Sequence, residues 1–220
     1  MTQKILYEDN HLIIVDKPAG MLTQPSGTDR ENLEDLIKEM IKVRDKKPGN
    51  VFLHAIFRLD HPVGGIVLFA KSRKALTRLQ EYQKKKQYHK SYEAIVEGIP
   101  KKEEDTLEHY LVHDSYHAKV ITKDTPGAKL ARLHYRRIKT LNNNKSLLKV
   151  TLETGRYHQI RVQLAAIGHP IVGDKKYGAT TTQQQDTIAL KHVGLRFLHP
   201  VTKEEVSVSV KPAEGRAGSV

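Results

Sequence analysis

The sequence predicts an α+β fold with a central sheet, because strand-like segments with apolar residues at alternate positions recur along most of the chain. In residues 90–97 the side chains of Tyr92, Ala94 and Val96 share one face, which is typical of a half-buried strand. Further strand-like runs occupy residues 5–7, 12–15, 51–56, 66–70, 118–122, 131–141, 147–152, 188–197 and 205–210. The three asparagines at 142–144 predict a hairpin turn between two of these strands.

Three further segments have apolar residues at helical spacing, and each is expected to begin at a residue that can cap a helix. The expected helices run from Leu33 with Asn32 as N-cap, from Ser72 as N-cap to the Lys84, Lys85, Lys86 cluster, and from Thr154 to Gly168. Their expected inner faces are Leu33, Leu36, Ile37, Met40 and Ile41, then Leu76, Leu79 and Tyr82 or Gln83, then Ile160, Leu164 and Ile167. The polar run at residues 183–185 predicts a surface connection.

Residues 51–71, VFLHAIFRLDHPVGGIVLFAK, form the segment around which the chain is organised, with Asp60 at the edge of a predicted strand. The connection between the two apolar runs contains Arg58, Asp60, Pro62, Gly64 and Gly65. From the residues alone, Arg58 and Asp60 could form a surface ion pair, cap a turn or serve catalysis.

Length and charge limit the possible classes of protein. With 220 residues, 38% of them hydrophobic, the chain can bury one good-sized core, so we expect one domain. The 37 Lys and Arg residues against 25 Asp and Glu give a net charge of +12. This charge favours a protein that binds nucleic acid over a soluble basic protein without such a partner. A membrane-surface role would need an amphipathic basic helix or a lipidation site, and neither is evident.

Residue types and motifs that are missing from the sequence narrow the chemistry further. The chain has no cysteine, which excludes disulfides, thiolate catalysis and Cys-based zinc sites, and without a secretory segment this fits an intracellular protein. The glycines form neither a P-loop nor a dinucleotide-binding fingerprint, and no serine nucleophile elbow occurs. His109 and His113 are four apart but lack the accompanying pattern of a zinc helix, so we expect no metal.

Four blocks of the sequence together resemble the RluA-type RNA pseudouridine synthases. In order they are ILYEDNHLIIVDKPAGMLTQPSG, FRLDHPVGGIVLFAK, KSYEAIVEG and TGRYHQIRVQLAAIGHPIVGDKKYG, and the resemblance covers nearly the whole chain. It implies the pseudouridine synthase fold, a mixed, mostly antiparallel sheet flanked by helices and loops, with a basic cleft. It also implies one catalytic domain over residues 1–220, with no N-terminal accessory RNA-binding domain.

The activity implied is the isomerisation of specific uridines in structured ribosomal or transfer RNA to pseudouridine, with no cofactor or metal. We expect a cytoplasmic monomer without membrane attachment. Carried over by position, Asp60 matches the catalytic aspartate, Tyr92 the active-site tyrosine and Arg161 the arginine that pairs with the aspartate. Arg58 matches the arginine that enters the RNA helix as the target base leaves it.

Four further residues are candidates for RNA binding, and five positions differ from the family pattern. Tyr157 is expected to bind RNA by stacking or else to be simply repacked, and Lys84, Lys85 and Lys86 either contact phosphates or form a solvated helix end. The departures are Phe57 and Gln163 in place of His, Val63 and Gly64 in place of Thr-Ser, and Tyr157 in place of Thr. None of them removes a catalytic group.

Two other classes of function compete with this interpretation. A non-catalytic RNA-binding module would have no need of an arginine-paired aspartate beside a tyrosine. A glycoside or nucleoside hydrolase of the usual kind needs a second carboxylate near the first, and the central block supplies Asp60 alone.

Overall fold

The computed structural model describes residues 3–183 and 186–211, and the chain divides into two compact units. Unit 1 comprises Met1–His89 and Gly194–Val210, and unit 2 comprises Lys90–Val193 and Lys211–Val220. Two glutamines of the predicted surface connection, at 184–185, lie outside the described residues. The expectation of a single catalytic domain stays a prediction.

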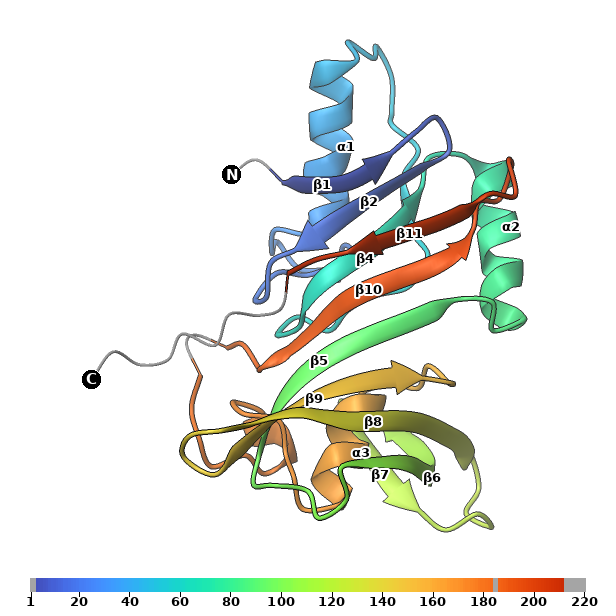
Figure 1. Cartoon of the computed structure of the whole chain (residues 1–220). Coiled ribbons are helices and arrows are strands. Elements are labelled where there is room, and N and C mark those ends of the chain that lie inside the picture. Colours follow the sequence, from blue (N-terminus) through green and yellow to red (C-terminus); the bar gives the residue numbers. More distant parts are fainter. Residues whose placement is uncertain (1–2, 184–185, 212–220) are drawn as a thin grey trace. The chain divides into compact units, whose positions relative to one another are not determined.

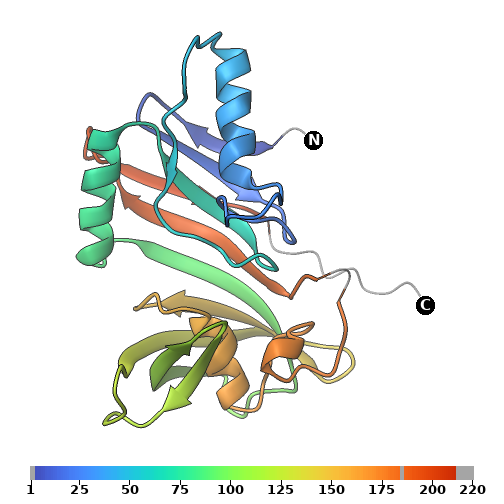
Figure 2. The same cartoon turned by 180° about the vertical axis from the view of Figure 1, so that it is seen from behind.

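Unit 1 is a sheet covered on one face by two helices (Figures 1 and 2). Its strands are β1 (Lys4–Glu8), β2 (Leu12–Lys17), β3 (His54–Ala55), β4 (Gly64–Ala70), the later part of β10 (Leu190–Leu198) and β11 (Glu205–Ser209). The strand order is β1-β2-β4-β10, with β3 paired to β4 and β11 to β10. The helices α1 (Leu33–Arg44) and α2 (Arg73–Lys84) lie on the same face of this sheet, as Figure 2 shows.

The predicted helix caps of unit 1 are confirmed. The Asn32 side chain accepts a hydrogen bond from the Asp35 backbone N–H at 3.0 Å, and the Ser72 hydroxyl accepts one from Ala75 at 3.2 Å. In α2, Ala75 joins Leu79 as a buried residue, while the Gln83 side chain is exposed. Of the two alternatives for the last inner position, Tyr82 is half-buried and Gln83 is not, so the inner face continues through Tyr82.

Unit 2 contains a five-stranded antiparallel arrangement in the order β5-β9-β8-β6-β7. Its strands are β5 (His89–Glu97), β6 (Glu104–Asp114), β7 (His117–Ile121), β8 (Lys129–Leu141) and β9 (Lys145–Leu152). The predicted hairpin between β8 and β9 is confirmed, with Asn143 and Asn144 at φ values of 59° and 51°. Helix α3 (Gln159–Ala166) packs on β6 and β7, and a 3₁₀ turn, η1 (Lys175–Tyr177), follows it.

Three sequence-based expectations differ from the structure. Strand β6 was not predicted, because its outward residues are mostly charged and only Leu107 and Leu111 are buried apolar positions within it. The third helix begins at Gln159 rather than Thr154, because the Thr154 hydroxyl binds the backbone N–H of Arg132 at 2.8 Å and holds the intervening residues as a loop. The strand expected over residues 51–56 is limited to β3.

The mixed, mostly antiparallel α+β fold is confirmed. No helix among the described residues combines the length and the apolar character that crossing a bilayer requires.

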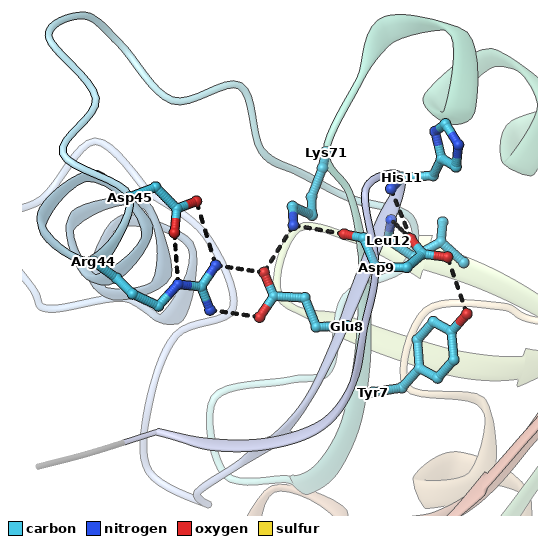
Figure 3. A network of polar contacts seen from close by, with 8 residues as sticks. All are labelled: Tyr7, Glu8, Asp9, His11, Leu12, Arg44, Asp45 and Lys71. Carbon is cyan, nitrogen blue, oxygen red and sulfur yellow. Dashed lines mark hydrogen bonds and ion pairs between the residues drawn. The ribbon is translucent and has the colours of Figure 1, made fainter.

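A partly exposed network of ion pairs ties β1 to the rest of unit 1 (Figure 3). The Arg44 guanidinium, at the end of α1, donates two hydrogen bonds of 2.7 Å to the Glu8 carboxylate on β1. The Lys71 ammonium, just after β4, lies 2.7 Å from the same carboxylate and donates to the Asp9 carbonyl at 2.6 Å. The Arg44 hydrogen bonds, assisted by Lys71, lower the pKa of Glu8 to about 2.

We predict that Glu8→Gln lowers the free energy of unfolding at pH 7 by about 1 kcal/mol, a value that allows for solvent screening. Because folding depresses the Glu8 pKa from 4.5 to about 2, the stabilisation is present above pH 4.5 and is lost as the pH falls toward 2. Urea denaturation of both proteins over this range is the measurement. Glu31→Gln, which changes an exposed carboxylate, is the control, and a stability difference that persists unchanged at the lowest pH would contradict the assignment.

Candidate active site

Asp60 lies half-buried in the loop between β3 and β4, as expected from the sequence. Arg58 is exposed and Leu59 is buried, so the loop turns alternate side chains outward and inward. The backbone N–H of Val63 donates to the Asp60 carbonyl at 3.0 Å and closes a tight turn. The Asp60 carboxylate is therefore carried by a short, internally bonded loop.

A second loop of unit 1, residues 18–23, holds the Asp60 loop on both sides. The Thr23 hydroxyl donates to the Leu59 carbonyl at 2.9 Å and accepts from the Leu59 N–H at 3.1 Å. Beyond the aspartate, the Gly20 N–H donates to the His61 carbonyl at 2.9 Å. The residues before and after Asp60 are thus fixed to one common segment, which leaves its backbone little freedom.

The departure at Gly64 has a packing consequence. A Cβ at this position would lie 3.2 Å from the Ala19 nitrogen and 3.3 Å from the Lys17 carbonyl oxygen. The two backbones can approach this closely because residue 64 has no side chain. A serine, common here in the resembling family, would require one of the two segments to shift.

Lys17 is a site residue that the sequence analysis did not single out. Its side chain is only 1% exposed, and its ammonium donates to the carbonyls of Met21 at 2.6 Å and Pro18 at 3.1 Å. Burial lowers the pKa of Lys17 to about 8, while the negative charge of Asp60 acts in the opposite direction. The apolar run that precedes it in β2, residues 12–15, is continuous and not alternating, so no sequence pattern marked Lys17 as buried.

Tyr92 occupies the predicted inward position on β5 in unit 2 and is buried. Its ring stacks on His192, with centroids 4.6 Å apart and planes inclined by 20°. His192 lies in the first part of β10 and is fully buried. The phenol ring of Tyr92 therefore has a fixed plane, set by an aromatic neighbour that sequence reasoning did not identify.

Arg161 lies on α3 and makes a bidentate ion pair with Asp174. Its Nε and Nη2 atoms are 2.7 and 2.8 Å from the two carboxylate oxygens, and the side chains are 6% and 1% exposed. Asp174 belongs to the predicted loop after α3, but no sequence pattern pointed to this pairing. Asp60 belongs to unit 1, and its pairing with Arg161 stays a prediction.

The aromatic ring of Tyr177, in η1, lies beside the same guanidinium, with 5.1 Å between the Arg161 Cζ and the ring centroid. The Tyr177 hydroxyl accepts from the Ala118 N–H at 2.9 Å and lies 2.7 Å from Nδ1 of His158. The Tyr177 hydroxyl and the His158 imidazole thus share one hydrogen bond, whose direction is set by the His158 tautomer. Burial, followed by the Arg161 charge, lowers the pKa of His158 to about 3, in agreement with a neutral imidazole.

The predicted RNA-contacting residues have different surroundings. Tyr157 is 37% exposed, and its ring packs on His158 at a centroid distance of 3.8 Å and on His113 at 4.1 Å. Lys84, Lys85 and Lys86 are exposed where α2 ends, in unit 1. The structure thus keeps both features at the surface.

Two departures from the family pattern serve packing in this chain. Phe57 is buried with its ring edge-to-face against Tyr88, at a centroid distance of 6.0 Å. Gln163 is fully buried on α3, and its amide donates to the carbonyls of Leu107 and Ala131 at 3.2 Å each. Gln163 therefore joins α3 to β6 and β8.

Comparison with known proteins agrees with these observations. The family model described as RNA pseudouridylate synthase matches residues 11–166. The tRNA pseudouridine synthase C of Haemophilus influenzae is 30% identical over 94% of this chain and 91% of its own length. The ribosomal large subunit pseudouridine synthase C of Rickettsia prowazekii is 35% identical over 96% of this chain and 68% of its own length.

The fold is also found in a solved structure. Human RNA Pseudouridylate Synthase Domain Containing 4 superposes with a TM-score of 0.79 at 21% identity, covering 96% of this chain and 89% of the human one. Other curated relatives are longer, and the chain spans 65% of the length of two of them. The matched residues and the identity to the bacterial enzymes show that this chain belongs to the RNA pseudouridine synthase family.

Proposed function

We propose that this protein isomerises specific uridines in structured ribosomal or transfer RNA to pseudouridine, with Asp60 as the catalytic carboxylate. The observation that carries the proposal is the Asp60 loop, bonded on both sides to residues 18–23 beside the buried Lys17, in a member of this family. Relatives named for transfer RNA and for the large ribosomal subunit support both substrate classes. We also propose a cytoplasmic monomer.

The reaction requires the bond between N1 of uracil and C1′ of ribose to break, the uracil to turn and C5 to join the same C1′. The C5 proton then leaves and a proton returns to N1, so atoms balance without a cofactor. Asp60 can act as nucleophile toward the sugar or the base, or as a base that assists elimination. Each route needs Asp60 ionised and fixed in place.

Two cations are proposed to act on the Asp60 carboxylate. Lys17 interacts with its charge within unit 1. Arg161, through the proposed pairing, supplies a planar guanidinium that can bind a carboxylate with two hydrogen bonds. Tyr92 has its ring plane fixed by His192, which suits stacking on the detached uracil, and its hydroxyl can transfer a proton at C5 or the sugar.

The target uridine must leave its stack before it can react. Arg58 is exposed two residues before Asp60, so its planar cation can fill the space that the flipped base vacates. Lys84, Lys85 and Lys86 are proposed to contact phosphates, and Tyr157 is proposed to stack on a nucleotide of the bound RNA.

We predict that Asp60→Asn abolishes pseudouridine formation, lowering the rate by about 10⁴-fold or more, while RNA binding is kept. The amide is nearly the same size but can neither attack as a carboxylate nor accept a proton. Tritium release from C5-labelled uridine in RNA, together with carbodiimide-blocked primer extension, measures the product.

Asp124→Asn, an exposed substitution in unit 2, is the matched control, and a melting curve accompanies each variant. A folded Asp60→Asn protein that still makes pseudouridine at more than a trace rate would disprove the catalytic assignment. Release of free uracil by the wild type would point instead to a hydrolase.

We predict that Arg58→Ala lowers turnover by about 10²-fold and changes affinity for unmodified RNA much less, because the side chain acts only when the base is flipped. Single-turnover rates and filter binding separate the two effects. Arg73→Ala removes an exposed arginine at the start of α2 as control. Equal losses of rate and affinity would make Arg58 an ordinary phosphate contact.

We predict that RNA affinity falls steeply with salt, because a protein of net charge +12 releases counterions when it binds a polyanion. Replacing Lys84, Lys85 and Lys86 with alanine should reduce the slope of log K against log salt by about 2. Replacing the exposed Lys46 and Lys47, after α1, is the control. A flat plot for the wild type, or an unchanged slope in the triple variant, would count against electrostatic binding at this surface.

A further inference from the structure

We propose that Asp174 and Tyr177 are positioning residues, which hold the Arg161 guanidinium in one orientation so that it can orient the catalytic carboxylate. The inference rests on the proposed function. It assigns a role to the loop after α3, which contributes both residues.

Asp174 fixes the guanidinium within its plane. Two hydrogen bonds of 2.7 and 2.8 Å join Nε and Nη2 of Arg161 to the two carboxylate oxygens. Because the guanidinium is rigid and planar, fixing these two nitrogens also fixes the directions of all its other N–H bonds. A lysine at position 161 would have no such fork and would rotate about its single ammonium.

Tyr177 limits motion out of that plane. Its ring lies 5.1 Å from the Arg161 Cζ and is itself held by hydrogen bonds at its hydroxyl, to the Ala118 N–H and to His158. The ring also packs against a buried cluster that includes Val162, the neighbour of Arg161 on α3. An edge contact from Asp174 and a ring contact from Tyr177 together define one guanidinium orientation.

The loop that carries both residues is rigid. The Asp174 carbonyl accepts from the N–H groups of Tyr177 at 3.0 Å and Ala179 at 3.1 Å, and its own N–H donates to the Ile171 carbonyl at 2.9 Å. Gly173 has a φ of 86°, and a Cβ there would lie 2.8 Å from the Thr187 carbonyl oxygen. The carboxylate is thus presented from backbone that has few alternative conformations.

Stability alone does not account for this arrangement. A buried ion pair is often no more stabilising than apolar residues of the same volume, because both charges lose their hydration. What an apolar pair could not provide is a cation with a defined direction. Orientation of the Arg161 guanidinium is therefore the role that accounts for Asp174.

The first test is Asp174→Asn, with Asp114→Asn on the exposed end of β6 as control. We expect kcat to fall by about 10²-fold and KM for RNA to change little, because the misplaced group acts on chemistry and not on binding. A folded Asp174→Asn protein with the wild-type kcat would overturn the inference.

The second test is a double-mutant cycle with Arg161→Ala. If Asp174 acts through Arg161, the double variant should be no slower than Arg161→Ala alone. Fully additive losses would overturn the inference, because they would mean that Asp174 acts independently. Arg161→Met with Asp174→Leu replaces both charges by apolar groups and so leaves no unpaired buried charge. Its kcat should be no lower than that of Arg161→Met alone, and a further loss at equal melting temperature would overturn the inference.

The third test does not alter the ion pair. Tyr177→Phe keeps the ring beside Arg161, while Tyr177→Leu removes it, so kcat should be substantially higher for Phe than for Leu at equal melting temperature. Equal kcat values would overturn the role of the ring. If Asp174→Asn does not fold, the apolar double variant and this pair decide the matter.

Failure of the inference is distinguishable from failure of the proposed function. A wild-type protein that modifies no ribosomal or transfer RNA would refute the function itself. An active wild type whose folded Asp174 and Tyr177 variants keep full kcat would refute only the positioning role.

Discussion

The buried ammonium of Lys17 is the constraint on which the geometry around Asp60 depends. A buried ammonium has lost its hydration and needs oxygen acceptors within the protein. Here the Lys17 ammonium donates hydrogen bonds to the carbonyls of Pro18 and Met21. These bonds hold the 18–23 loop close to the end of β2, and Gly20 and Thr23 of the same loop bind the residues on both sides of Asp60. One charge at the end of a strand thereby shapes two loops and adds a positive potential beside a carboxylate.

Unit 2 also contains a buried cation that is held by hydrogen bonds to oxygen atoms. Here the cation, Arg161, comes from a helix and the fixed oxygens come from a loop, through Asp174. In both units a buried cation is bonded to oxygens of a hydrogen-bonded loop, backbone carbonyls for Lys17 and a side-chain carboxylate for Arg161, which fits groups whose direction matters. The two cases differ in that Lys17 is satisfied by neutral carbonyls and keeps its net charge, while Arg161 is partly neutralised by its partner.

Local patterns predicted those features of the fold that depend on neighbouring residues. The alternation in β5 and the caps at Asn32 and Ser72 follow from interactions within a few residues, and they were correctly predicted. Strand β6 was missed because its pairing with β7 and β8, rather than its own composition, makes it a strand. Similarly, Thr154 could not be recognised as a loop residue without knowing that β8 supplies its partner.

The same distinction applies to the candidate site. Asp60, Arg58, Tyr92 and Arg161 were found because they lie in sequence blocks that resemble a family, and their catalytic roles stay predictions. His192 was not found because its ring contact joins it to a strand far away in the chain. Asp174 lies in the same sequence block as Arg161, but only the fold of the intervening loop brings the two side chains together. The burial of His158 gives unit 2 one more property. Its pKa is about 3 in the folded protein and 6.5 for an unperturbed histidine. Between these values only the unfolded chain binds the proton, so His158 lowers the stability of unit 2 as the pH falls below 6.5.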